Sequence, residues 1–264
     1  MRLRNLLFVM RNRDTWRPSK YVRQNGRLVA SRDPKEVGVA SRLIADRTAR
    51  FYETNLKLHA KGRLLDLGCG KVPLFDTYRQ YVTDNICIDW ENTTYKYDRL
   101  DTYEGDHLDF EADLTKELPC ADGEFDTIIL SDVLEHVAEP ERLCGEIARV
   151  LSPKGKLLMN VPFYYMLHEE PHDYYRYTEF ALRRFMDRSG MQILQLQAMG
   201  GAPEVMLDVF SKNVMHVPVA GVPVATVSHW VTSALIHTSV GRRISEATAR
   251  NFPLGYFLVA AKPG

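Results

Sequence analysis

The densest group of chemically active side chains lies in residues 162–178, which read PFYYMLHEEPHDYYRYT. Two histidines, His168 and His172, accompany Asp173, and a histidine paired with a carboxylate is a common general base for a hydroxyl nucleophile. We therefore take these three residues as the candidate catalytic group. An arginine and several tyrosines suit an acceptor with a carboxylate, a phosphate, a sugar or an aromatic ring. The candidate substrate-binding residues are Tyr164, Tyr174, Tyr175 and Arg176.

Two other interpretations of this segment are open. It could be a hydrogen-bonded lid without an acid–base role. His168 and His172 also have the i, i+4 spacing that places two histidines on one helix face around a metal ion. Pro171 lies between them and opposes a helix, so we expect no metal site.

A glycine turn with an unusual acid lies further upstream, in LLDLGCG at residues 64–70. Glycines after a strand allow a tight turn and a close approach of the backbone to a ligand. A nicotinamide or flavin enzyme would continue to a third glycine, where this chain has Pro73, and Asp66 would repel a pyrophosphate. The turn therefore suits a cationic ligand. Its candidate binding residues are Asp66, Gly68, Cys69 and Gly70.

Acids also follow the next predicted strands. Asp89 comes 19 residues after Gly70, and a carboxylate at that place can accept both hydroxyl groups of a ribose. Trp90 beside it could stack on a purine. Asp113 could accept from an adenine amino group, and the amide of Leu114 could donate to a ring nitrogen.

The fourth predicted strand, FDTIILS, ends at Ser131 and Asp132, on the same edge of the sheet. His136 follows in LEHV and could reach the same cleft. A histidine bonded to a backbone carbonyl in the core is the alternative for this residue.

The elements that must position these residues alternate along the chain. Short apolar runs and strand-like patterns predict strands at residues 63–67, 85–90, 109–114, 125–131, 156–162, 191–199 and 255–261. Helical spacing predicts helices at 74–82, 139–151 and 179–189, the last capped by Thr178 and stopped by Gly190. The turn SPKG is expected to separate the second helix from the fifth strand. This alternation predicts a doubly wound α/β sheet with its ligand crevice at the carboxyl ends of the strands.

These segments together resemble the class I S-adenosylmethionine-dependent methyltransferases, in particular the broad small-molecule group. The similar segments are LLDLGCG, CIDW, ADL, LPCADGEFDTIILSDVLEHV and RVLSPKGKLLMNVPF, over residues 63–163. The resemblance implies a Rossmann-like, seven-stranded, mostly parallel sheet with helices on both faces, and S-adenosylmethionine lying across the strand ends. It implies that Asp66, Gly68 and Gly70 flank the amino acid part of the cofactor. Asp89 would bind its ribose, Asp113 its adenine, and Ser131 and Asp132 its methionine side.

Two departures from the resembled family are visible. Many members have a further glycine where this chain has Val72. About 50 residues also separate the last two predicted strands, which usually form a near-direct hairpin. Residues 213–241 contain no lysine, arginine, aspartate or glutamate, and residues 229–238 could form one apolar helix. We expect a helical insertion that acts as an acceptor-site cap, a dimer interface or a face lying on a membrane.

The composition is that of a globular protein: 264 residues, 34 basic and 34 acidic side chains, and 45% hydrophobic residues. Residues 1–50 hold 13 lysines and arginines against four acids, a net charge of +9 that could meet lipid phosphate or pack on the acidic remainder. No motif indicates specific nucleic-acid binding. Four scattered cysteines and no long apolar run favour a cytoplasmic protein, with peripheral contact to the inner face of a membrane as an extension.

The sequence thus predicts four regions. They are a basic arm and helix (1–60), a cofactor-binding α/β core (61–199), a largely apolar insertion (200–253) and the last strand (254–264). We expect O-methylation of a small or glycan-like acceptor, assisted by a His/Asp base, in a monomer or a homodimer. The alternatives are a cofactor-binding scaffold without catalysis and a nicotinamide-dependent oxidoreductase.

Overall fold

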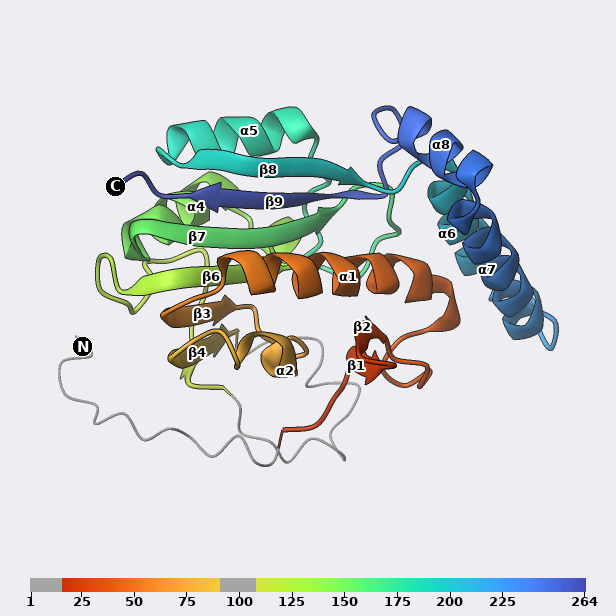
Figure 1. Ribbon diagram of the computed structural model, residues 1–264, viewed down its shortest axis with the longest axis horizontal. Helices are drawn as coiled ribbons and strands as arrows, with labels where there is room; N and C mark the ends of the chain where they lie inside the picture. Colours follow the sequence, from red (N-terminus) through yellow and green to blue (C-terminus); the bar gives the residue numbers. More distant parts are fainter. Residues whose placement is uncertain (1–15, 91–107) are drawn as a thin grey trace.

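The computed structural model describes residues 16–90 and 108–264, so the first 15 residues of the predicted basic arm lie outside the described residues. A seven-stranded sheet in the order β5-β4-β3-β6-β7-β9-β8 forms its centre (Figure 1). The strands from β5 to β7 pair in parallel, and β9 is antiparallel to both of its neighbours. The strands are β3 (Arg63–Leu67), β4 (Asp84–Asp89), β5 (Phe110–Glu111), β6 (Phe125–Ser131), β7 (Leu151–Pro162), β8 (Gln192–Met199) and β9 (Gly255–Ala261). The predicted Rossmann-like sheet is confirmed.

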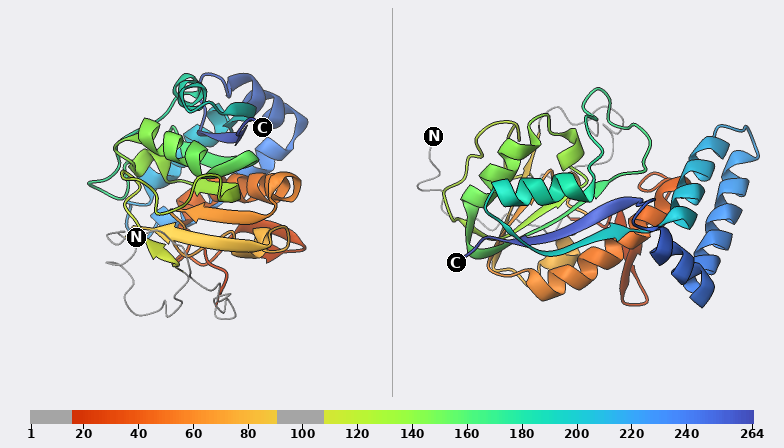
Figure 2. Two further views of the ribbon diagram at one scale, coloured as in Figure 1. Left: turned by 90° about the vertical axis from the view of Figure 1, so that its left-hand side faces the viewer. Right: turned by 90° about the horizontal axis from the view of Figure 1, so that it is seen from above.

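Helices cover both faces of the sheet because its strands are apolar on both faces (Figure 2). In β6, Ile128 and Leu130 pack in the cluster that includes α4 (Pro140–Val150) and α5 (Glu179–Arg188). Ile129, between them, packs in the cluster on the other face, together with α1 (Arg42–His59). A small hairpin, β1 (Tyr21–Gln24) and β2 (Arg27–Ala30), packs beside α1.

Several predicted boundaries differ from the structure. The helix expected at 74–82 is the single turn α2 (Phe75–Tyr78), and the strand expected at 109–114 pairs only over β5. Strand β7 begins at Leu151, so the turn residues SPKG form an irregularity within the strand, between the pairs Phe125↔Leu151 and Thr127↔Lys156. Thr178 caps α5 as predicted, because its hydroxyl oxygen accepts a hydrogen bond from the amide of Ala181.

Three helices occupy the segment between β8 and β9: α6 (Ala202–Val214), α7 (Gly221–His237) and α8 (Ser239–Thr248). They project beyond the end of the sheet at which the parallel strands finish (Figures 1 and 2). Helix α7 begins at Gly221 rather than at the expected residue 229, because Pro223 lies in the first turn, where a missing N–H breaks no helical hydrogen bond. Among the described residues, no helix is long and apolar enough to cross a membrane.

A buried polar hub ties α1 to the strand ends. Asn160 on β7 accepts hydrogen bonds through Oδ1 from the hydroxyls of Tyr52, at 2.8 Å, and Ser131, at 2.9 Å. Its amide also donates to the carboxylate of Asp132. Burial raises the pKa of Tyr52 well above its ordinary value, so the phenol stays neutral and donates. The hub therefore fixes the end of β6, where the candidate site begins.

Replacing Asn160 with alanine should lower the free energy of unfolding by about 2–4 kcal/mol, because two buried hydroxyl groups lose their acceptor. Tyr52→Phe removes one hydrogen bond without leaving Asn160 unpaired, since Ser131 still donates, and should cost about 1 kcal/mol. Urea denaturation of both variants measures the difference. Equal losses of stability in the two variants would show that Asn160 is not the shared acceptor of both hydroxyl groups.

Candidate active site

A cleft of about 490 Å³ opens at the carboxyl ends of the parallel strands. Its described lining comes from residues 19–174, so no residue of the 200–253 insertion lines it. The insertion approaches the cleft wall through Lys212, whose Nζ lies 3.2 Å from the ring centroid of Tyr165. The predicted site residues in the lining are Asp66, Gly68, Cys69, Gly70, Asp89, Trp90, Asp113, Leu114, Ser131, Asp132, His136, His168, His172 and Tyr174.

Two positions of the turn after β3 favour glycine, for different reasons. Gly68 has φ of +66°, and a Cβ there would lie 2.4 Å from a methyl group of Val133. Gly70 has φ of +50° with open space where a Cβ would stand, and its amide donates to Asp89 Oδ2 at 2.7 Å. The turn thus packs against the start of the β6 loop on one side and opens to the cleft on the other.

The carboxylates at the end of β4 and just after β5 accept hydrogen bonds from neighbouring residues of the loops. Asp89 accepts from the amide of Gly70 through one oxygen and from the amide of Trp90 through the other, at 2.7 Å each. Asp113 accepts from the amide and the hydroxyl of Thr115, and the hydroxyl contact is the largest cause of its lowered pKa. These contacts fix the orientation of both carboxylates at the edge of the cleft.

The cleft therefore fits a nucleoside with a cationic amino acid tail. Acids stand at the ends of β3, β4 and β6 and just after β5, and Gly70 leaves room for a close approach. The contacts of Asp89 with a ribose and of Asp113 with an adenine stay predictions, and both residues line the cleft.

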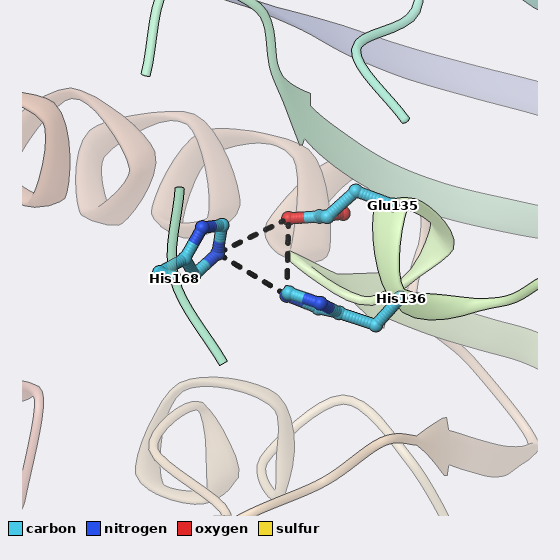
Figure 3. A group of neighbouring side chains, drawn as sticks. All are labelled: Glu135, His136 and His168. Atoms are coloured by element: carbon cyan, nitrogen blue, oxygen red, sulfur yellow. Dashed lines mark hydrogen bonds and ion pairs between the residues drawn. The ribbon is translucent and has the colours of Figure 1, made fainter. Parts of the chain in front are cut away.

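A second polar group lies beside this part of the cleft, after β6. The 3-10 turn η3 (Leu134–His136) brings Glu135 and His136 toward His168 from the distant 162–178 segment (Figure 3). The Nε2 atoms of His136 and His168 are 3.1 Å apart. Oε1 of Glu135 lies 3.9 Å from Nε2 of His136 and 4.0 Å from Nε2 of His168. We call these three residues the histidine–glutamate cluster.

The alternative for His136 is partly borne out, because its Nδ1 lies 3.0 Å from the carbonyl oxygen of His172. It still lines the cleft. Glu135 is fully buried, and burial followed by the charge of Asp132 raises its pKa well above the ordinary value. Sequence reasoning missed Glu135, although an acid directly before His136 in VLEHV was a visible signal.

His168 is oriented by Asp173, as the candidate catalytic pair requires. Asp173 Oδ2 accepts from the amide of His168 at 2.9 Å and lies 3.2 Å from its Nδ1. Burial opposes ionisation of Asp173, but hydrogen bonds from Arg176 and from the His168 amide lower its pKa to about 2. Burial, followed by the charge of His136, lowers the pKa of His168. At neutral pH the pair is a neutral imidazole beside an ionised carboxylate.

The other predicted residues of this segment stand elsewhere. Arg176 does not line the cleft, because its guanidinium group donates two hydrogen bonds to Asp173 and one to the carbonyl oxygen of Met166. The Tyr175 hydroxyl donates to the carbonyl oxygen of Ala138. Tyr164 contacts the rings of Phe163, edge to face, and Phe252, and it too is outside the lining. Direct substrate contact is thus expected of Tyr174 alone among the four.

His172 lines the cleft away from the catalytic pair. Its Nδ1 lies 3.0 Å from the hydroxyl of Tyr174, and its ring meets the edge of Trp90 at a centroid distance of 4.9 Å. The cleft lining also includes polar side chains that sequence reasoning did not select, among them Lys20, Tyr165 and Glu169. Lys20 forms an ion pair with Asp132 at 2.7 Å. Its distance from Asp132 in the chain left no local signal.

The sheet order, the cleft at the strand ends and the acids around it are typical of a Rossmann-like α/β domain that binds a nucleoside-containing cofactor. Residues 65–159 match the family described as "Methyltransferase domain". A ubiquinone biosynthesis O-methyltransferase of Xanthomonas euvesicatoria is 33% identical over 115 residues, covering 42% of this chain and 46% of that protein. One from Thiobacillus denitrificans is 29% identical over 169 residues, covering 57% and 72%.

The chain spans less than half the length of two curated relatives, the Xanthomonas enzyme and an uncharacterized Streptomyces fradiae transposon protein, of which it covers 46% and 43%. Solved structures agree on the fold. A methyltransferase of Archaeoglobus fulgidus superposes with a TM-score of 0.52 at 14% identity, covering 84% of this chain and 97% of the other. The [4+2]-cyclase SpnF superposes with 0.50 at 19% identity, covering 93% and 87%.

Residues 65–159 thus form a methyltransferase domain, in agreement with the resemblance to the class I, S-adenosylmethionine-dependent methyltransferases. S-adenosylmethionine is its cofactor, so the resemblance predicted from the motifs is confirmed.

Replacing Asp89 with alanine should weaken binding of S-adenosylhomocysteine by about 1–3 kcal/mol, because two ribose hydroxyl groups lose a charged acceptor. Isothermal titration calorimetry measures the affinity, with NAD as a ligand that should not bind. Asp76→Ala is the matched control, because Asp76 pairs with Arg23 and Arg79 outside the cleft lining. Unchanged affinity in the Asp89 variant would overturn the assignment of the ribose site.

Proposed function

We propose that this protein transfers a methyl group from S-adenosylmethionine to a hydroxyl oxygen of a small or glycan-like acceptor. The cofactor supplies an electrophilic methyl group, so the protein must align the acceptor and help remove its proton. The observation that carries the proposal is the pair His168–Asp173. His168 belongs to the histidine–glutamate cluster and lines the same cleft as Asp66, Asp89 and Asp113.

His168 is favoured over His172 as the residue that takes the proton. Asp173 is ionised and lies beside Nδ1 of His168, so Nε2 of His168 faces His136 and the neutral ring can accept a proton. His172 contacts Tyr174 and Trp90 instead and has no carboxylate partner among the described residues. Asp173 is therefore a positioning residue, and Arg176 keeps it charged.

The oxygen specificity is supported by two kinds of observation. The relatives from Xanthomonas and Thiobacillus are O-methyltransferases by name. A hydroxyl group also needs a base more than a thiol does, and this cleft provides one. The acceptor end is lined by Tyr165 and Tyr174, whose rings suit a sugar or an aromatic acceptor, and by Lys20.

A cofactor-binding scaffold without catalysis is the second candidate. The likeness to a [4+2]-cyclase favours keeping it, because one fold carries different reactions. A scaffold would need neither an oriented histidine nor a buried glutamate next to the cofactor cleft. The nicotinamide-dependent oxidoreductase lacks such support, since Pro73 lines the cleft where a dinucleotide fold has its third glycine.

We further propose that the insertion helices bring the enzyme to an anionic membrane surface, with a homodimer as the competing occupant. Exposed apolar side chains stand on all three helices: Met206, Val209 and Phe210 on α6, Val222, Val227, Trp230, Val231 and Leu235 on α7, and Val240 and Ile244 on α8. Residues 213–241 carry no acid that would repel anionic lipid, and Arg242 and Arg243 follow directly. Amphipathic surfaces of this kind bind membranes through apolar area and through basic residues.

The His168→Ala variant should lower kcat by about 10²–10⁴-fold while leaving the affinity for S-adenosylhomocysteine near that of the wild type. The measurement is transfer of labelled methyl from S-adenosylmethionine to a panel of catechols, hydroxybenzoates and sugars. His172→Ala is the matched control, a cleft histidine without a carboxylate partner, and should change kcat by less than ~10-fold. If His168→Ala keeps full turnover, the base lies elsewhere. If the wild type binds the cofactor and methylates no acceptor, the scaffold candidate gains.

The wild type should co-sediment with vesicles that contain anionic lipid, and Trp230→Ser should weaken this binding, because Trp230 is 72% exposed on α7. Leu58→Ser is the control, since Leu58 is 68% exposed on α1, outside the insertion. High salt should release the part of the binding that depends on basic residues, which contribute about 1 kcal/mol each. If the protein stays in the supernatant at low and high salt and runs as a dimer, the apolar surface binds a second copy of the chain and not a membrane.

A further inference from the structure

In the histidine–glutamate cluster, two ring nitrogens face each other as hydrogen-bond acceptors without a donor between them. Nδ1 of His136 lies 3.0 Å from the carbonyl oxygen of His172. Nδ1 of His168 lies 3.3 Å from the carbonyl oxygen of Met166 and 3.2 Å from Asp173 Oδ2. Each Nδ1 is surrounded by acceptors, so we assign each ring proton to Nδ1. The two Nε2 atoms then face each other at 3.1 Å with lone pairs and no proton between them.

Glu135 adds an independent observation. Its side chain is fully buried, and neither carboxylate oxygen has a hydrogen-bond partner among the described residues. Burial makes the isolated carboxyl group costly to ionise, which is why its pKa is raised, and buried carboxylates are normally paired or bound to a metal ion. Oε1 points at the two Nε2 atoms, as Figure 3 shows, so one positive charge placed there would satisfy all three groups.

We propose that Glu135, His136 and His168 bind one divalent transition-metal ion in the wall of the cleft. The ligand atoms of the three residues lie within 4.8 Å of one another. Two nitrogens bound to one ion at about 2.0–2.1 Å, at angles of 90–110°, would be separated by about 2.9–3.4 Å, and the observed 3.1 Å agrees. Glu135 needs to approach by under about 1 Å, given metal–oxygen distances near 2.1 Å.

The surrounding groups fit the same ion. Metal-bound histidines usually donate their other ring N–H to a carbonyl or a carboxylate, and here His172 O serves His136 while Asp173 serves His168. Glu169 Oε2 lies 3.8 Å from Nε2 of His136 and offers a fourth oxygen. Two imidazoles and a carboxylate, with a position left open, form a donor set that suits Zn²⁺, Mn²⁺ or Fe²⁺ better than Mg²⁺ or Ca²⁺.

The role of the ion rests on the proposed function. An ion next to the acceptor would bind its hydroxyl group and lower the pKa of that group. His168 would then act as a ligand and Asp173 as the carboxylate that orients it, so the loss of turnover in His168→Ala is expected with either role. Sensitivity to a chelator separates the two roles. Metal binding itself depends on neither the acceptor nor the methyl transfer.

The test is a titration of the purified, chelator-treated full chain with Zn²⁺ and Mn²⁺, followed by calorimetry, with Mg²⁺ as the comparison ion. We expect one equivalent of Zn²⁺ or Mn²⁺ per chain and weaker binding of Mg²⁺. His136→Ala should abolish this binding, and Glu135→Gln should weaken it at least 10-fold. The matched control, His172→Ala, should bind like the wild type, because its imidazole stands outside the cluster.

Two readouts guard against variants that fail to fold. Affinity for S-adenosylhomocysteine shows that each variant keeps the cleft. In the wild type, pulsed electron paramagnetic resonance of bound Mn²⁺ should show nitrogen couplings from two histidines. The absence of ion binding, or stoichiometric binding that survives in His136→Ala and Glu135→Gln, would overturn the site. Full methyl transfer in excess chelator, by protein free of metal, would remove the ion and leave the methyltransferase proposal intact.

Discussion

The parallel pairing of β4, β3, β6 and β7 is the constraint on which the candidate site depends. Parallel strands end at one edge of the sheet, so their loops converge although they are far apart in the chain. The carboxylates of Asp66 and Asp89 line one cleft for this reason, together with Asp132. Asn160 stabilises this edge of the sheet, because it accepts hydrogen bonds from α1 and from the end of β6.

Gathering so many acids at one edge creates a repulsion that the structure offsets residue by residue. Lys20 pairs with Asp132, and Arg176 pairs with Asp173 behind the cleft. Backbone amides of the glycine turn and of Trp90 hold Asp89. Glu135 is the exception among these acids, since it is buried and has no such partner among the described residues. A cationic cofactor and a metal ion are both ligands that an excess of negative charge at this edge would attract.

The fold of this domain does not by itself determine the reaction. The sheet order and the glycine turn belong to a domain that binds S-adenosylmethionine, but a [4+2]-cyclase has a similar fold. The chemistry depends on the side chains in and around the histidine–glutamate cluster. These side chains come from two segments, the η3 turn and residues 163–178, which connect the strands and α-helices. The insertion of α6, α7 and α8 adds an apolar surface next to them without entering the cleft lining.

The sequence by itself predicted the sheet, the cofactor class, the cap at Thr178 and the acids at the strand ends, because apolar periodicity and strand-end position are local properties. It could not predict that the SPKG residues lie within β7 as an irregularity, or that α7 begins at Gly221. It also could not predict that Arg176 binds Asp173 instead of facing a substrate. Only the tertiary structure brought His168 to within 3.1 Å of His136, across 32 residues, and buried Glu135 beside them. The physical reason is that burial and ring-to-ring distance depend on how the loops pack over the sheet edge, and no spacing along the chain encodes that packing.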